Sequence, residues 1–159
     1  MTRPSHPAGT YVGLYGSLGE DWRCRAKALL DVARVPWHDP SDSRWQGITL
    51  ENGDQHQALI NELVAEEHEG LLKAGCVVYQ LTGGSEPPSS LAARFELGLL
   101  TGRGIDTFVH VEPEALGRNY IWAAVKQYPH LVRCDSVEEA VQRAIEKMGR
   151  VGSGVQRRI

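Results

Sequence analysis

The amino-acid sequence predicts an α/β fold: a three-layer, flavodoxin- or Rossmann-like domain in which helices cover both faces of a five-stranded parallel sheet. Apolar runs of strand length alternate five times with segments of helical periodicity, without internal repeats or linkers. Right-handed crossovers between such strands give a parallel sheet, for which we expect the strand order 2-1-3-4-5. The length of 159 residues and the hydrophobic share of 42% fit one domain with its own core. We assign this domain to residues 1–149 and expect a flexible basic tail at 150–159.

The first strand, turn and helix span residues 11–35. Residues 11–15 are a short apolar run, and residues 20–35 carry Trp22, Ala26 and Leu30 at helical spacing. Gly16 and Ser17 begin the turn between them, and two interpretations of this turn remain open. Its backbone N–H groups hold an anion at the start of the helix, or the tight turn simply needs small residues.

A short edge strand and a long polar loop follow. Residues 35–38 have strand character, but Pro36 favours an edge position because proline donates no hydrogen bond to a neighbouring strand. Residues 39–54 are polar and include Trp45 and Gln46. Because a disordered connector usually lacks tryptophan, we interpret this segment as an ordered binding loop. A long amphipathic helix, with most of its acids in solvent, is expected over residues 55–74.

The centre of the chain combines a buried strand with a helix that holds one acid. Residues 76–81 form a continuous apolar run, which is typical of a buried parallel strand. The glycines and prolines of residues 82–90 end it, and Ser89 or Ser90 caps a helix over residues 91–100. Glu96 is the only acid of that helix and shares a face with apolar residues. It is either a site carboxylate at the carboxyl end of a strand or an ordinary surface glutamate.

The last third of the chain continues the alternation of strand and helix. Strands are expected at residues 105–111 and 130–134, and a helix opens at 117–119 and runs to about Tyr128. Ser136 and Glu139 have the spacing of a capping box. The final helix should therefore begin there, and it is expected to end near Met148.

Composition excludes several classes of function. The formal charge of −3 and the pI near 6.1 do not favour a nucleic-acid polymer or an acidic membrane as partner. No apolar stretch has membrane-spanning length and the N-terminus lacks a signal-peptide core, so we expect a cytoplasmic protein. Cys24, Cys76 and Cys134 show no metal-binding spacing, and we interpret them as buried free thiols. Neither a metal nor a cofactor is indicated.

The loops at the carboxyl ends of the strands should surround one pocket. None of them carries a Gly-x-Ser-x-Gly, His-Glu-x-x-His or phosphate-loop lysine motif. A serine nucleophile at Ser17, Ser89 or Ser90 would need one of six scattered histidines as its base. The remaining candidate is carboxylate chemistry on a glycosidic carbon. A carboxylate can attack the anomeric carbon as an oxocarbenium-like transition state develops.

Four segments occur in a recognisable order and spacing. They are the opening strand and turn at residues 11–17, the helix at 67–74, the segment from Ser89 through Glu96-Leu97-Gly98, and the polar turn at 117–119. In this arrangement the chain resembles the nucleoside 2-deoxyribosyltransferase-like family, especially its divergent second branch, over about residues 11–145. The resemblance implies a flavodoxin-like domain that cleaves the N-glycosidic bond of a nucleoside or nucleotide.

The resemblance also implies roles for individual residues. By position, Glu96 is the nucleophile and forms a covalent sugar intermediate. Trp45 and Gln46 stack on and hydrogen-bond the base. A position such as that of Asn119 is often supplied by a neighbouring subunit, so a homo-oligomer is expected, with Tyr120 and Trp122 as interface candidates. The substrate-binding set implied in this way comprises Gly16, Ser17, Trp45, Gln46, Ser89, Ser90 and Asn119.

Two departures from the family pattern affect the leaving group. Gly75 stands where the family usually has an aspartate before the central strand, and Ser90 stands where many transferases have a second one. Activation of the leaving base must then come from elsewhere, for which His38, Asp39 and Glu67 are the candidates. The alternatives are simple hydrolysis, a different nucleotide substrate, an NAD-cleaving enzyme, or a nucleotide-binding or sensor module without catalysis.

Overall fold

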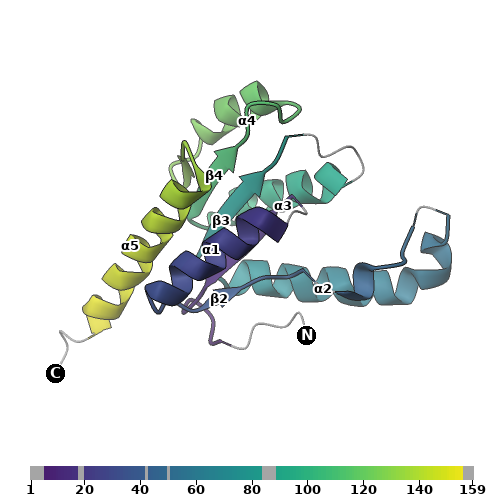
Figure 1. The fold of residues 1–159 in the computed structure, drawn as a ribbon, viewed down its shortest axis with the longest axis horizontal. Coiled ribbons are helices and arrows are strands. Elements are labelled where there is room, and N and C mark those ends of the chain that lie inside the picture. Colours follow the sequence, from purple (N-terminus) through teal and green to yellow (C-terminus); the bar gives the residue numbers. More distant parts are fainter. Residues whose placement is uncertain (1–5, 18–19, 42, 50, 84–88, 156–159) are drawn as a thin grey trace.

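A computed structural model describes residues 6–17, 20–41, 43–49, 51–83 and 89–155, apart from the side chains of residues 20, 89–90 and 151–155 (Figure 1). Five strands form one parallel sheet in the order β2-β1-β3-β4-β5. The fold class and the strand order are therefore confirmed. The strands are β1 (Val12–Gly16), β2 (Trp37–His38), β3 (Cys76–Leu81), β4 (Thr107–Val111) and β5 (Leu131–Arg133).

Helices cover both faces of the sheet and make three layers (Figure 1). On one face lie α1 (Glu20–Val32) and α5 (Val137–Val155). On the other lie α2 (Gln57–Lys73), α3 (Ser89–Arg103) and α4 (Arg118–Val125). Two short 3-10 helices, η1 (Ser43–Trp45) and η2 (Gly53–His56), lie in the connection from β2 to α2. Within the described residues, no helix combines the length and apolar character needed to cross a membrane.

Strand β3 is the centre of the sheet, and all of its residues are buried. Its side chains alternate between the two faces: Val78 packs with α1 and α5, whereas Val77 and Tyr79 pack with the helices of the opposite layer. The parallel register with β1 places Gly16 beside Gln80. The carboxyl ends of these two strands therefore meet at one edge, where a parallel sheet carries its ligand site.

The ends of two helices differ from the predicted ones. Helix α1 ends at Val32, three residues before the predicted end, because Arg34 adopts a left-handed conformation with φ of 56°. The N–H groups of Val35 and Arg34 then bond to the carbonyls of Leu30 and Asp31, which is a Schellman ending. Helix α5 begins directly after the predicted cap residue Ser136, whose Oγ accepts a hydrogen bond from the Glu139 N–H at 3.0 Å. It continues to Val155, beyond the predicted end near Met148. Residues 150–155 are thus helical.

Two predictions about burial are wrong. Cys24 is exposed because Trp22, Ala26 and Leu30 form the buried stripe of α1 and leave Cys24 on its solvent side; Cys76 and Cys134 are buried as expected. Trp122 is only 8% exposed and packs in the core under the Arg133 guanidinium, so it does not offer an interface surface. Tyr120, the other interface candidate, is 80% exposed.

Candidate functional site

A cavity of about 700 Å³ opens beyond the carboxyl end of β1. Its walls come from five parts of the chain: the end of β1, helix α1, the connection containing η1 and η2, helix α2 and the first turns of α3. Among the predicted site residues, the structure brings Gly16, Trp45, Glu67 and Glu96 together on these walls. The rest of the lining is mostly small or apolar, with Ala92, Ala93, Ile48 and Ile60 among it.

Glu96 is a buried acid in the wall of this cavity. Its residue is 8% exposed, and its Oε2 atom has no hydrogen-bond partner among the described residues. Burial, followed by the nearby carboxylate of Glu67, raises the pKa of Glu96 to about 8, although the Arg23 charge and the backbone N–H of Gly16 act in the opposite direction. A surface glutamate is therefore excluded. A purely structural glutamate would be ion-paired, for example with Arg94, Arg103 or Arg118, and the described contacts contain no such pair.

The position of Glu96 follows from the periodicity of α3. Ala93 and Leu100, three residues before and four residues after it, are both buried against the sheet. The hydroxyl of Tyr79 on β3 donates to the Ala93 carbonyl at 2.9 Å and fixes this part of the helix to the sheet. Glu96 is thus held on the inward stripe of the helix, at the place where the stripe passes the end of β1.

Glu67 on α2 and Trp45 on η1 form a second wall of the cavity. The indole N–H of Trp45 donates to the Glu67 carboxylate at 2.8 Å, and the Tyr15 hydroxyl donates to the Glu67 backbone carbonyl at 2.9 Å. The neighbouring Arg44 forms ion pairs with Glu62 and Glu66 at 2.9 and 2.6 Å. These contacts attach the connection after β2 to α2, so the predicted binding loop is ordered around Trp45.

Arg23 is a site residue that the sequence-based reasoning missed. It lines the cavity, yet it is only 5% exposed. Its Nη1 donates to the Ser17 carbonyl at 2.7 Å, its Nη2 to the Gly16 carbonyl at 3.3 Å, and its Nε lies 3.2 Å from Asp39. The available signal was its spacing, because Arg23 lies three residues before Ala26 and seven before Leu30, on the buried face of α1.

Asp39 and His38 lie outside the cavity lining. Burial alone would raise the pKa of Asp39, but hydrogen bonds from Lys27 and from the Ser41 N–H, with the Arg23 charge, hold it below its usual value. Asp39 is therefore an ionised partner for Arg23 and Lys27 and holds no proton to donate. His38 is buried between Tyr11 and Tyr15, at ring distances of 5.8 and 6.5 Å, and burial lowers its pKa.

Three further predicted residues also lie away from the cavity lining. Ser17 is fully buried, and its hydroxyl accepts the Thr82 N–H at 3.1 Å, which joins the ends of β1 and β3. Gln46 is exposed beside Trp45, and Asn119 is exposed in the first turn of α4. Ser89 and Ser90 form the first turn of α3, and their side chains lie outside the described part of the chain.

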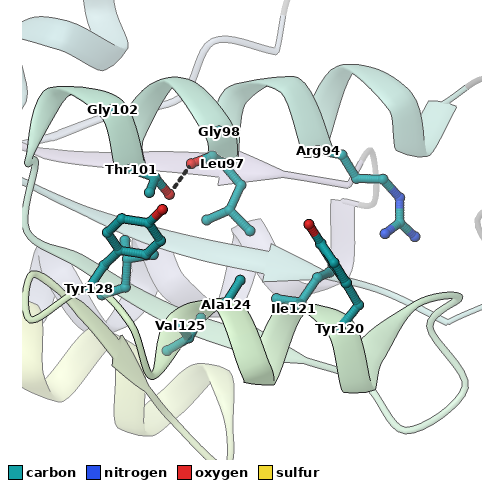
Figure 2. Close-up of a pocket in the computed structure, with 11 residues that line it drawn as sticks. Arg94, Leu97, Gly98, Thr101, Gly102, Tyr120, Ile121, Ala124, Val125 and Tyr128 are labelled. Carbon is teal, nitrogen blue, oxygen red and sulfur yellow. Dashed lines mark hydrogen bonds between the residues drawn. The ribbon is translucent and has the colours of Figure 1, made fainter.

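A second cavity, of about 580 Å³, lies between α3 and α4 (Figure 2). Leu97, Ile121, Val125 and Leu131 make it mainly apolar, and no carboxylate lines it among the described residues. Figure 2 shows Tyr128 beside the Thr101 side chain, whose hydroxyl bonds to the Leu97 carbonyl at 2.7 Å. Its polar side chains are those of Arg94, Thr101, Tyr120 and Tyr128, so among the described residues it lacks the carboxyl groups that the first cavity offers.

The first cavity offers the carboxyl groups of Asp54, Glu67 and Glu96, an aromatic side chain and a buried guanidinium. No group of three or more metal-binding side chains occurs within the described residues. No protein-family model matches the sequence, and a search of curated proteins also finds no match. The chemistry of the site therefore has to be inferred from its own residues.

Proposed function

We propose that the protein cleaves or transfers the N-glycosidic bond of a nucleoside or nucleotide, with Glu96 as the nucleophile. The observation that carries the proposal is the Glu96 carboxyl group: it is buried, one of its oxygens has no hydrogen-bond partner among the described residues, and it lines a cavity of about 700 Å³. Cavities of this size accommodate small organic ligands. The resemblance to the nucleoside 2-deoxyribosyltransferase-like family supports the same assignment for Glu96.

The reaction needs two carboxyl groups with different tasks. Glu96 attacks C1′ of the sugar, the C1′–N bond breaks, and its electron pair leaves with the base. Glu67 is the one of the three acid/base candidates that lines the same cavity. It is placed to supply a proton to the base or to take one from the water that later releases the sugar from Glu96. The backbone N–H of Gly16 lowers the pKa of Glu96 and so favours its ionised form.

The rate of base release should rise with pH until Glu96 is ionised. The folded-state pKa of Glu96 is about 8, so at pH 7 only about a tenth of the enzyme holds the charged nucleophile. We expect kcat/KM to be about tenfold lower at pH 7 than at its plateau above pH 8. The other groups around Glu96 are Glu67, Arg23, Tyr15 and Tyr79, and burial raises the pKa of both tyrosines out of this range. A rate that instead falls above pH 8 would assign Glu96 as a general acid and contradict the nucleophile.

Replacing Trp45 should separate stacking on the base from support of Glu67. Trp45→Ala removes both and should weaken binding by about 1–3 kcal/mol if the indole stacks on the base. Trp45→Phe keeps an aromatic face but loses the N–H that bonds to Glu67 at 2.8 Å. We therefore expect KM to rise less than in Trp45→Ala, and the loss in kcat of this variant to exceed its change in KM. Steady-state kinetics of both variants measure this difference. Unchanged kinetics in Trp45→Ala would remove Trp45 from the site.

The proposed function is tested by incubating the protein with nucleosides, nucleoside monophosphates and NAD, and measuring the free base by chromatography. Base released by the wild type and not by Glu96→Ala supports the proposal. A nucleotide-binding module without catalysis is the second candidate. The raised pKa favours it, since a protonated carboxyl at neutral pH donates a hydrogen bond and is a poor nucleophile. Ligands that raise the melting temperature without being cleaved would support this module instead.

A further inference from the structure

The cavity at Glu96 is acidic. Glu67, Glu96 and Asp54 line it, and Arg23 is the one basic side chain in its lining among the described residues. The guanidinium of Arg23 is already used, because it is bonded to the Ser17 and Gly16 carbonyls and paired with Asp39. A side chain that is 5% exposed, hydrogen-bonded through two nitrogens and ion-paired with Asp39 supports the turn and is not a docking point for a phosphate.

The connection that forms one wall of the cavity is also poor in cations. The connection from β2 to α2 contains one basic residue besides histidine, Arg44, which pairs with Glu62 and Glu66. Among the described residues, both the Arg23 side chain of the cavity wall and the Arg44 side chain of this connection are thus already ion-paired with acids of the fold.

We propose that the substrate of this site is a cationic nucleoside, with a quaternised heteroaromatic base such as a pyridinium or an N-alkylated purinium and no phosphate. The inference rests on the proposed cleavage by Glu96 and specifies its substrate class. It is carried by the acidic lining of the cavity, by the lack of an uncommitted cation among its described walls, and by the buried, unpartnered Glu96 oxygen.

Trp45 and Glu67 suit the base of such a substrate. Their hydrogen bond of 2.8 Å holds an indole and a carboxylate side by side on the same wall. A flat cation gains from both, through stacking and cation–π attraction with the ring and through direct attraction to the carboxylate. A neutral base gains only the stacking. The wall therefore discriminates by charge as well as by shape.

The reaction of a cationic nucleoside fits the acid/base groups that the cavity contains. Glu96 forms the C1′–O bond while the C1′–N⁺ bond breaks, and the electron pair returns to the ring nitrogen, so the base leaves neutral and needs no proton. Water then attacks C1′ and releases the sugar and the Glu96 carboxylate, with Glu67 accepting the proton of the water. A leaving-group acid is therefore unnecessary for a cationic base.

The substrate charge would also activate the nucleophile. Glu96 is protonated at neutral pH because of its burial and the neighbouring Glu67. A cation placed between the two carboxyl groups stabilises their ionised forms and lowers the pKa of Glu96. Binding of a cationic substrate and ionisation of Glu96 then favour each other. The negative charge of a nucleoside phosphate would disfavour both its own binding and the ionisation of Glu96.

The binding test uses two probes that differ in charge and cannot be cleaved: nicotinamide and its ring-N-methylated cation. Calorimetric titration at pH 7 should give a dissociation constant at least about tenfold lower for the cation. Glu67→Gln should remove most of this preference. Glu69→Gln is the matched control, because Glu69 lies on the same helix, pairs with Lys73 and does not line the cavity. Equal affinity for both probes, or a preference for the neutral one, would overturn the inference.

The cleavage test keeps failure of this inference apart from failure of the proposed function. Nicotinamide riboside should release its base faster than the corresponding mononucleotide, which differs by one phosphate, with Glu96→Gln as the blank. Cleavage of neutral nucleosides or of the phosphate form in preference to the riboside would keep Glu96 catalysis and overturn the substrate class. If no glycoside is cleaved, the proposed function fails, and the titration of the two probes still decides the charge preference.

Discussion

Glu96→Gln should reduce base release on the order of 10³-fold or more without lowering the stability of the protein. The amide has nearly the size of the carboxyl group, so the buried position on α3 between Ala93 and Leu100 stays filled. It can neither attack C1′ as an anion nor hold a covalent sugar ester that water resolves. The loss should therefore appear in kcat, while ligands that bind the cavity continue to raise the melting temperature.

The same substitution has an effect on stability whose sign follows from the pKa of Glu96. Its folded-state value of about 8 lies above the value of 4.5 for an ordinary glutamate. The folded form therefore binds its proton more tightly, and the wild type loses stability as pH rises from about 4.5 to 8. At about 1.4 kcal/mol per pH unit, this penalty amounts to a few kcal/mol at most above pH 8. Glutamine has no such penalty, so the variant should become the more stable protein as pH increases.

Denaturant unfolding at several pH values between 5 and 9 measures this difference. Glu138→Gln is a suitable control, because Glu138 is half exposed on α5 and pairs with Arg25 at 2.9 Å on the surface. It should change neither turnover nor the pH dependence of stability. If Glu96→Gln unfolds at lower denaturant than the wild type at pH 8, Glu96 has a structural role. Full activity in Glu96→Gln would contradict the proposed mechanism.

The sequence predicted the sheet well because its central strands are buried on both faces. β3 begins and ends at the predicted residues, since a continuous apolar run bounded by Gly75 and Thr82 leaves little choice of boundary. Helix ends were less predictable. The end of α1 depends on a left-handed Arg34, a conformation that a non-glycine residue rarely adopts and that composition does not reveal.

The candidate site was predicted in part, for reasons that differ among its residues. Glu96 could be found because an acid on an apolar stripe of a helix is visible as a pattern. Arg23 was missed because charged residues on a helix usually face solvent, although its spacing to Ala26 is that of the buried face. The partners of a charged residue depend on how distant segments pack in three dimensions. Arg23 pairs with Asp39 only because α1 packs under the turn after β1.

Gly16→Ala should destabilise the protein severely, by more than about 3 kcal/mol, which is the second large effect we expect. Gly16 has φ of 119°, a conformation that side chains other than glycine rarely adopt. A Cβ atom added there would lie 2.0 Å from the Gln80 carbonyl oxygen, where the ends of β1 and β3 meet. The clash involves backbone on both sides, so no side-chain movement relieves it. Gly98→Ala is the matched control: nothing lies within 4 Å of its added Cβ inside α3, and alanine favours a helix.

This result bears on the two interpretations of the turn after β1. The strain at Gly16 explains why small residues are required there, whether or not an anion binds. The carbonyl of the same residue accepts a hydrogen bond from Arg23, and its backbone N–H lowers the pKa of Glu96, so the turn acts on both groups in the wall of the cavity. We therefore expect Gly16→Ala to lose stability and ligand binding together in urea titrations and thermal shifts. If Gly16→Ala instead kept wild-type stability and lost only ligand binding, the turn would accommodate a Cβ atom. The close contact with Gln80 would then not determine the geometry of the site.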